Sequence, residues 1–99
     1  MTSLVWSPRA LRDIQTIFRF LNERTPHSPE IARRAVAAIR KGCVILRTQP
    51  QIGRPIEELD PAFREWLIDF GDSGCAAMYR FDGKRAVILA VRHQKEAGY

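Results

Sequence analysis

Residues 75–92 read CAAMYRFDGKRAVILAVR, the clearest structural pattern in the chain. Two runs rich in apolar residues, Cys75–Phe81 and Ala86–Arg92, flank the dipeptide Asp82-Gly83. An Asp-Gly pair between two such runs is typical of a tight β-hairpin, because the central positions of the turn favour positive φ. We therefore predict two antiparallel strands joined by this turn.

A third strand is predicted just before the hairpin. Trp66, Ile68 and Phe70 alternate with other residues, which is the period-two pattern of a strand with one apolar face. Residues 71–74 then predict a turn. The segment from 51 to 63, which contains glycine and two prolines, predicts a loop.

In the first half of the chain, the apolar residues recur with the period of an α-helix. Ser7-Pro8 and Ser28-Pro29 each offer an N-cap residue followed by a proline suited to the first helical turn. The apolar residues that follow recur at helical spacing, so we predict helices over residues 8–23 and 29–48. Gly42 lies inside the second helix at a cost of about 1 kcal/mol relative to Ala, and a close helix–helix or helix–sheet approach would explain it.

A short apolar strand at residues 3–6 completes the element order, which is β-α-α-β-β-β. The two helices form a hairpin, and each has one apolar face to cover. The predicted fold is therefore α+β, with a helical hairpin packed on a small antiparallel sheet. At 99 residues, the chain is expected to form one domain over residues 1–99.

Composition excludes several classes of protein. With 45% hydrophobic and 27% charged residues, the chain is unlike a disordered protein. Its apolar runs are too short to cross a bilayer and its N-terminus has no signal-peptide pattern, so we expect a cytoplasmic protein with no membrane contact. Cys43 and Cys75 lack metal-ligand spacing, and buried thiols are favoured over a disulfide, which spacing alone leaves open. No metal or other cofactor is expected.

Positive charge is concentrated in the first half of the chain. Residues 1–49 hold nine Lys or Arg against three Asp or Glu, whereas residues 50–99 hold seven against eight. Thirteen of the 16 basic residues are Arg, whose planar guanidinium makes bidentate contacts to carboxylates and phosphates. This pattern suits an acidic protein or nucleic-acid partner, and a solvated helix face explains it equally well.

The sequence offers one candidate catalytic group, at the ends of the predicted strands. It consists of Arg64, Arg80 and the pair Arg92-His93, which Tyr79 and Tyr99 are candidates to join. Such residues can hold RNA phosphates, with His93 or Tyr99 as general acid or base. The simpler interpretation is that the cations end their strands in solvent, paired with nearby carboxylates. Phosphate-loop, zinc-protease and hydrolase motifs are absent from the sequence.

Several motifs resemble the RelE/ParE superfamily of bacterial toxins. They are Trp6-Ser7-Pro8, Pro50-Gln51-Ile52-Gly53-Arg54, Met78-Tyr79-Arg80-Phe81 and the closing Ile88-Leu89-Ala90-Val91-Arg92-His93. The resemblance covers essentially the whole chain, and its ending is similar to the ParE, or plasmid-stabilisation, branch. It implies the same β-α-α-β-β-β topology and a cognate antitoxin whose extended C-terminal segment wraps the toxin.

Two activities follow from the resemblance. Members of the RelE branch cleave mRNA in the ribosome, and under that alternative the catalytic residues are Arg64, Arg80, His93 and Tyr99. ParE-like members inhibit DNA gyrase. Where RNase-type relatives often carry an Arg, three residues before Tyr79, this chain has Ala76, which favours the non-nuclease branch. A decayed toxin that serves only in transcriptional autoregulation is a third alternative.

Two interaction surfaces are expected. The antitoxin is predicted to bind the Arg-rich helices, through Arg9, Arg12, Arg19, Arg33, Arg34 and Arg40. Gyrase is predicted to bind the end of the chain, through Arg92, His93, Gln94, Lys95, Glu96 and Tyr99. DNA is expected to be contacted only indirectly, through the antitoxin, since no recognition helix stands out.

Overall fold

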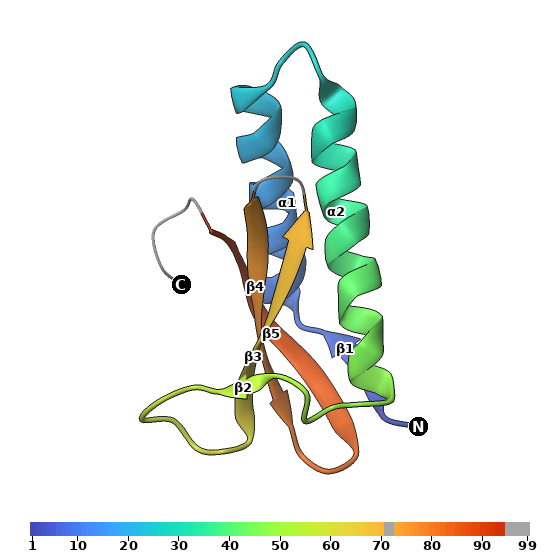
Figure 1. The fold of residues 1–99 in the computed structure, drawn as a ribbon, viewed down its shortest axis with the longest axis vertical. Helices are drawn as coiled ribbons and strands as arrows, with labels where there is room; N and C mark the ends of the chain where they lie inside the picture. The colour runs from blue at the N-terminus through green and yellow to red at the C-terminus, as the bar shows by residue number, and fades with distance from the viewer. Residues whose placement is uncertain (71–72, 95–99) are drawn as a thin grey trace.

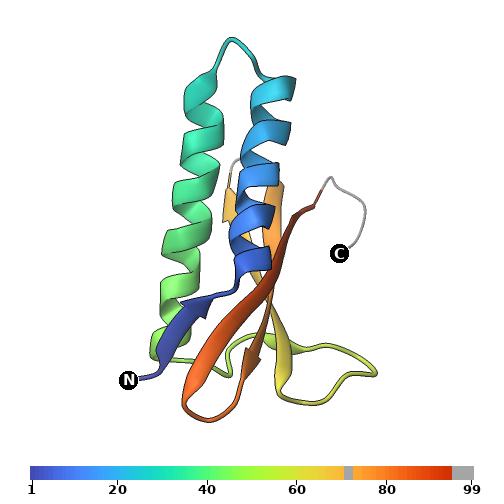
Figure 2. The ribbon, with the colours of Figure 1, turned by 180° about the vertical axis from the view of Figure 1, so that it is seen from behind.

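A helical hairpin lies against one face of a five-stranded sheet in the computed structural model, which describes residues 1–70 and 73–94 (Figures 1 and 2). The helices are α1 (Pro8–Arg24) and α2 (Pro29–Cys43), and α2 continues into a 3₁₀ helix, η1 (Val44–Arg47). The strands are β1 (Ser3–Trp6), β2 (Arg54–Pro55), β3 (Phe63–Phe70), β4 (Ser73–Phe81) and β5 (Arg85–His93). The predicted α+β fold and element order are confirmed.

The sheet has the strand order β1-β5-β4-β3-β2. Strands β3, β4 and β5 are antiparallel neighbours, as predicted. The short β2, which was not predicted, pairs antiparallel with β3, and β1 adds a parallel edge beside β5, so the sheet as a whole is mixed. The β4–β5 turn is where Asp82-Gly83 predicts it: Gly83 has a φ of +95°, and Asp82 Oδ1 accepts hydrogen bonds from the N–H groups of Lys84 and Arg85. A parallel β1 is possible because α1 and α2 carry the chain across the sheet before it returns.

Helix α1 begins where the cap residues predict, and its cap also fixes it to the sheet. Ser7 Oγ accepts a hydrogen bond from the Ala10 N–H at 3.1 Å and donates one to the Leu89 carbonyl at 3.2 Å. Six residues later, Asp13 Oδ2 accepts from the Val91 N–H at 2.9 Å. Since β1 ends at Trp6, these two α1 contacts satisfy β5 backbone groups that no strand covers.

The start of α2 is confirmed, but two details of this helix were predicted wrongly. Ser28 makes no side-chain capping bond, so Pro29 and the acidic first turn start the helix without it. The α-helix ends at Cys43 instead of continuing to residue 48. At this point the Gly42 carbonyl accepts a hydrogen bond from Trp66 Nε1 at 2.9 Å, a tertiary contact that accompanies the change to η1.

The expected close approach at Gly42 is confirmed. A Cβ atom at this position would lie 2.9 Å from Ile68 Cγ2 on β3. The absence of a side chain therefore lets α2 lie directly on the sheet.

The loop and strand boundaries differ in part from the prediction. Residues 54–55 form β2 within the predicted loop, and β3 begins at Phe63, three residues before the first apolar residue of the alternation. Strand β4 begins at Ser73, inside the predicted turn, and the rest of that turn, residues 71–72, lies outside the described residues.

The core forms between the helices and the sheet. Helix α1 packs on β5 and α2 packs on β3. Cys43 and Cys75 are both buried thiols, as predicted, and no disulfide joins them in the described structure. Within residues 1–70 and 73–94, neither helix is long and apolar enough to cross a membrane.

Candidate functional site

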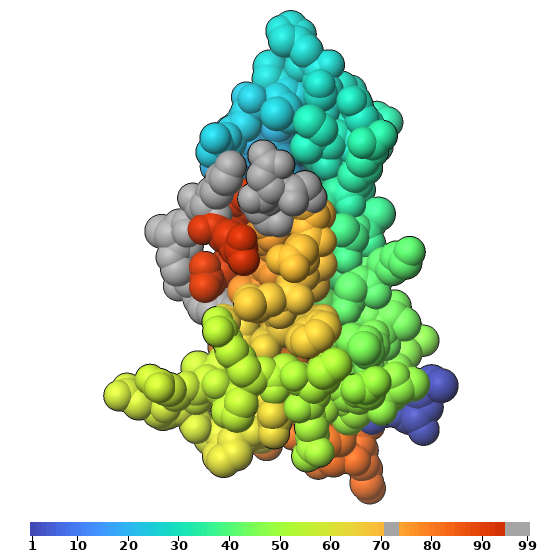
Figure 3. All heavy atoms as spheres, viewed as in Figure 1, coloured from blue at the N-terminus to red at the C-terminus, as the bar shows by residue number. Residues whose placement is uncertain are grey.

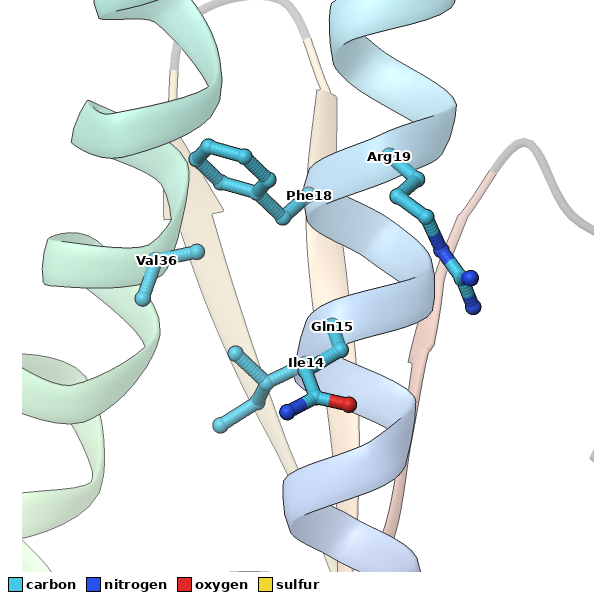
Figure 4. Close-up of a pocket in the computed structure, with 5 residues that line it drawn as sticks. All are labelled: Ile14, Gln15, Phe18, Arg19 and Val36. Atoms are coloured by element: carbon cyan, nitrogen blue, oxygen red, sulfur yellow. The ribbon is translucent and has the colours of Figure 1, made fainter.

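A groove on the helical hairpin is the first candidate site (Figure 4). Its volume is about 430 Å³, and Ile14, Gln15, Phe18, Arg19 and Val36 line it. Phe18 and Val36 point toward one another from the two helices, while Arg19 extends away from α2 (Figure 4). We call this feature the hairpin groove. Its floor is apolar, and its side chains come from both helices.

Arginines lie at or near the hairpin groove on both helices. Arg12 lies seven residues before Arg19, so the two share one face of α1. On α2, Arg33 and Arg40 lie three residues before and four residues after Val36, and therefore flank it. The Arg40 guanidinium also lies 5.6 Å from the centre of the Trp6 ring. Of the six arginines predicted to bind the antitoxin, Arg19 lines the groove, and helical spacing places Arg12, Arg33 and Arg40 near it on the two helices.

The other two arginines of that set lie elsewhere on the helices. Arg9 Nε is 3.7 Å from Asp13 Oδ2, on the side of α1 that faces β5. Arg34 follows Arg33 directly, so its side chain is turned by about 100° around α2, away from Val36. The sequence places all six on helices but does not show which of them share a face across the hairpin.

Arg64 and Arg80, two of the candidate catalytic residues, lie on opposite faces of the sheet. Arg64 is paired with Tyr79 and Arg80 with Phe63, and paired residues share a face. Tyr79 is fully buried on the helix side, so Arg64 points to that side and Arg80 to the other. Arg64 NH1 donates to the carbonyls of Gly53 at 2.7 Å and Gln51 at 3.1 Å, which gives it a structural role.

His93 lies far from both arginines and is buried. Its side chain is 1% exposed, and its ring centre lies 5.5 Å from that of Phe20 and 5.9 Å from that of Phe70. His93 pairs with Cys75 on β4. Cys75 and Arg80 are five positions apart on that strand, which separates them by about 17 Å. The structure therefore does not bring Arg64, Arg80 and His93 together, so the arrangement does not support the alternative in which they form one catalytic site.

A bulge in β5 explains why His93 faces the core. Met78 pairs with Ala90 and Tyr79 with Ile88, so Leu89 is an extra residue in β5. Beyond Leu89, the side chains of β5 therefore point to the opposite faces of the sheet from those that a regular strand would give. As a result Val91 and His93 point into the core, whereas Arg92 is only half-buried. Without the bulge, Arg92 would be the residue facing the helices.

The predicted gyrase-binding segment is described only in part. Gln94 is exposed, and its N–H donates to the Gly74 carbonyl at 2.9 Å. Lys95, Glu96 and Tyr99 lie outside the described residues. No group of three or more His, Cys, Asp or Glu residues that could hold a metal ion occurs in the part of the chain that the structure describes.

Tyr79 has a role that the sequence did not indicate. The prediction that it joins a surface group is wrong, because its side chain is fully buried. Its hydroxyl donates to the Pro50 carbonyl at 2.7 Å and accepts from the Gly53 N–H at 3.0 Å. Burial raises the pKa of the Tyr79 phenol, so it stays protonated and able to donate.

Comparison with known proteins places this geometry in a family. The model of the ParE toxin of the type II toxin-antitoxin system parDE matches residues 4–98. This chain belongs to the ParE toxin family. A solved structure described as a chromosomal ParDE toxin-antitoxin system from P. aeruginosa is 27% identical, with a TM-score of 0.77. That match covers 94% of this chain and 96% of the other. The search of curated proteins found no match.

The family confirms the resemblance found in the sequence. As a ParE toxin, the chain is the toxin component of a type II toxin-antitoxin system. Such a system consists of a toxin and the antitoxin that neutralises it, which implies a cognate antitoxin as the partner of this ParE toxin.

Proposed function

We propose that this ParE toxin inhibits DNA gyrase through protein–protein contact, without catalysing a reaction of its own. The separation of the candidate catalytic residues supports this best: Arg64 holds the chain after η1, Arg80 points from the other face, and His93 is buried among aromatic rings. A ribonuclease needs its phosphate-binding and acid–base groups within reach of one phosphodiester.

The cognate antitoxin is proposed to bind at the hairpin groove. Its apolar floor, between Phe18 and Val36, suits the apolar side of an amphipathic segment. The four arginines at or near the groove suit acidic residues on the flanks of that segment. Buried apolar contacts would supply much of the affinity, and the positive charge would speed association. Recognition of operator DNA sequence would then belong to the antitoxin.

The gyrase contact is proposed to lie at the end of the chain, over residues 92–99. His93 is buried, so in this proposal it anchors the end of β5, and the neighbouring residues make the contact. Removal of residues 94–99 is expected to weaken toxicity more than antitoxin binding. Undiminished toxicity of the shortened chain would remove this segment from the mechanism.

The deciding experiment is to induce the toxin alone and pulse-label DNA and protein synthesis. We expect DNA synthesis to fall first, together with a DNA-damage response, and purified gyrase to lose supercoiling activity when the toxin is added. An earlier fall in translation would instead identify a ribosome-dependent mRNA interferase. Arg80→Ala is the matched variant, because Arg80 is exposed. Growth arrest should be unchanged in this variant under our proposal and strongly reduced in an interferase.

A further inference from the structure

A polar pocket lies between the start of β1 and the β4–β5 turn. Figures 1 and 2 show these two segments at the end of the molecule opposite the α1–α2 turn. Its volume is about 700 Å³, and a second hollow of about 370 Å³ extends it along β1. Both hollows are open to solvent, and they share Met1, Thr2 and Arg47. The residues that line the larger hollow are Met1, Thr2, Arg47, Thr48, Gly83 and Lys84. We call it the basal pocket.

Backbone hydrogen bonds hold the walls of the basal pocket in place. The Thr2 N–H donates to the Arg47 carbonyl at 2.9 Å, and the Ser3 N–H donates to the Lys84 carbonyl at 3.3 Å. The start of β1 therefore lies between the end of η1 and the β4–β5 turn. Arg47 and Lys84 are thus on opposite walls of the pocket.

The basal pocket is positively charged. Arg47 and Lys84 are both exposed, and none of the lining residues is acidic. Among the described residues, the ion pairs are Arg9–Asp13 and Arg54–Glu65, and neither involves Arg47 or Lys84. Asp82 is the acid nearest in sequence, and its Oδ1 accepts the two backbone N–H bonds that close the turn. Two cations facing one hollow without a bound carboxylate favour an anion between them.

We propose that the basal pocket binds a phosphate group, either free or in a nucleic-acid strand, between Arg47 and Lys84. The Arg guanidinium presents a planar pair of donors to two phosphate oxygens, and the Lys ammonium adds a compact charge from the other wall. Such contacts hold the phosphate without reading bases, so operator sequence is left to the antitoxin. The site is separate from the hairpin groove and does not depend on the gyrase proposal.

The test is an NMR titration of the full chain at low salt, first with inorganic phosphate and then with a 12-base-pair DNA duplex. We expect saturable shifts of the amide signals of Thr2, Thr48 and Gly83. Arg47→Gln with Lys84→Gln should weaken binding at least tenfold. For the duplex it should also reduce the slope of log affinity against log salt by about one unit for each lost contact.

The control is Arg34→Gln with Lys41→Gln, which removes the same two charges from the outer face of α2, where they lie seven residues apart. It should leave the shifts intact. If the duplex binds more tightly than inorganic phosphate, the source of the phosphate is a nucleic-acid strand. If the two bind equally, the ligand is the free anion. Absent saturable shifts, or equal weakening by both double variants, would overturn the proposal, because binding would then belong to the whole basic surface.

Discussion

The buried hydroxyl of Tyr79 donates a hydrogen bond to the carbonyl of Pro50, 29 positions earlier in the chain, at 2.7 Å. The same oxygen accepts from the Gly53 N–H at 3.0 Å, and Arg64 donates to the carbonyls of Gln51 and Gly53. The chain between η1 and β2 is therefore held by side chains from β3 and β4 instead of by regular structure. In Figure 3 this segment, in green, covers the lower part of the sheet.

Tyr79→Phe tests that arrangement. The variant keeps the ring but leaves a buried donor and an acceptor without their partner, so we expect a loss of about 1–3 kcal/mol in the free energy of unfolding. Urea denaturation followed by circular dichroism measures it. Thr16→Ala is the control, because the Thr16 hydroxyl makes an exposed bond to the Arg12 carbonyl within α1 and its loss should not destabilise. Equal stability of Tyr79→Phe and the wild type would show that the hydroxyl contributes nothing.

Stability should also fall at alkaline pH because of Cys43. Burial raises the pKa of its thiol from about 9 to about 12. The unfolded chain therefore loses this proton at a lower pH than the native chain does. The contribution of the protonated Cys43 thiol to the free energy of unfolding is fully present below pH 9. It decreases by about 1.4 kcal/mol per pH unit as pH rises from 9 to 12.

Cys43→Ala isolates this effect. We expect the wild type to lose about 2 kcal/mol more than the variant between pH 8 and pH 10.5, measured by urea denaturation under reducing conditions. The buried Tyr79 phenol is present in both proteins, so its titration cancels in the comparison. Parallel pH profiles for the two proteins would contradict the assignment.

The elements that could be predicted are those set by neighbouring residues. Ser7-Pro8 caps α1 through a bond three residues away, and Asp82-Gly83 closes its hairpin locally. By contrast, the end of α2 coincides with a contact from Trp66, and β2 forms by pairing with β3. Partners distant in sequence determine these features, and a single sequence does not show such partners.

The difference between local and distant partners also explains how much of the candidate site could be predicted. Helical spacing places the arginines on α1 and α2, but the hairpin groove appears only when Phe18 and Val36 meet across two helices. His93 is a catalytic candidate in the sequence because it lies at the end of a predicted strand. The Leu89 bulge reverses the alternation before it, and an inserted residue of this kind has no signal in the period-two pattern.

Gly42→Ala tests the approach of α2 to the sheet. Alanine gains about 1 kcal/mol of helix propensity, but its Cβ would lie 2.9 Å from Ile68 Cγ2 in the core. Overpacking of this kind costs about 1–3 kcal/mol, so we expect a net loss of stability. In the Gly42→Ala background, Ile68→Ala should cost less than it does in the wild type, because the new methyl group fills part of the cavity. Additive losses in thermal unfolding would show that the two positions do not contact.

Arg33 and Arg34 are adjacent in sequence, yet the structure gives them different roles. Arg33 lies one helical turn before Val36, which lines the hairpin groove, and Arg34 is turned away from that face of α2. If the antitoxin binds there, Arg33→Glu should slow association with the cognate antitoxin several-fold, and the difference should shrink at high salt. Arg34→Glu makes the same charge change one residue later and should have a much smaller effect. Stopped-flow association rates at two salt concentrations measure both variants. Equal slowing would mean that the antitoxin responds to the net charge of the helices and not to the groove.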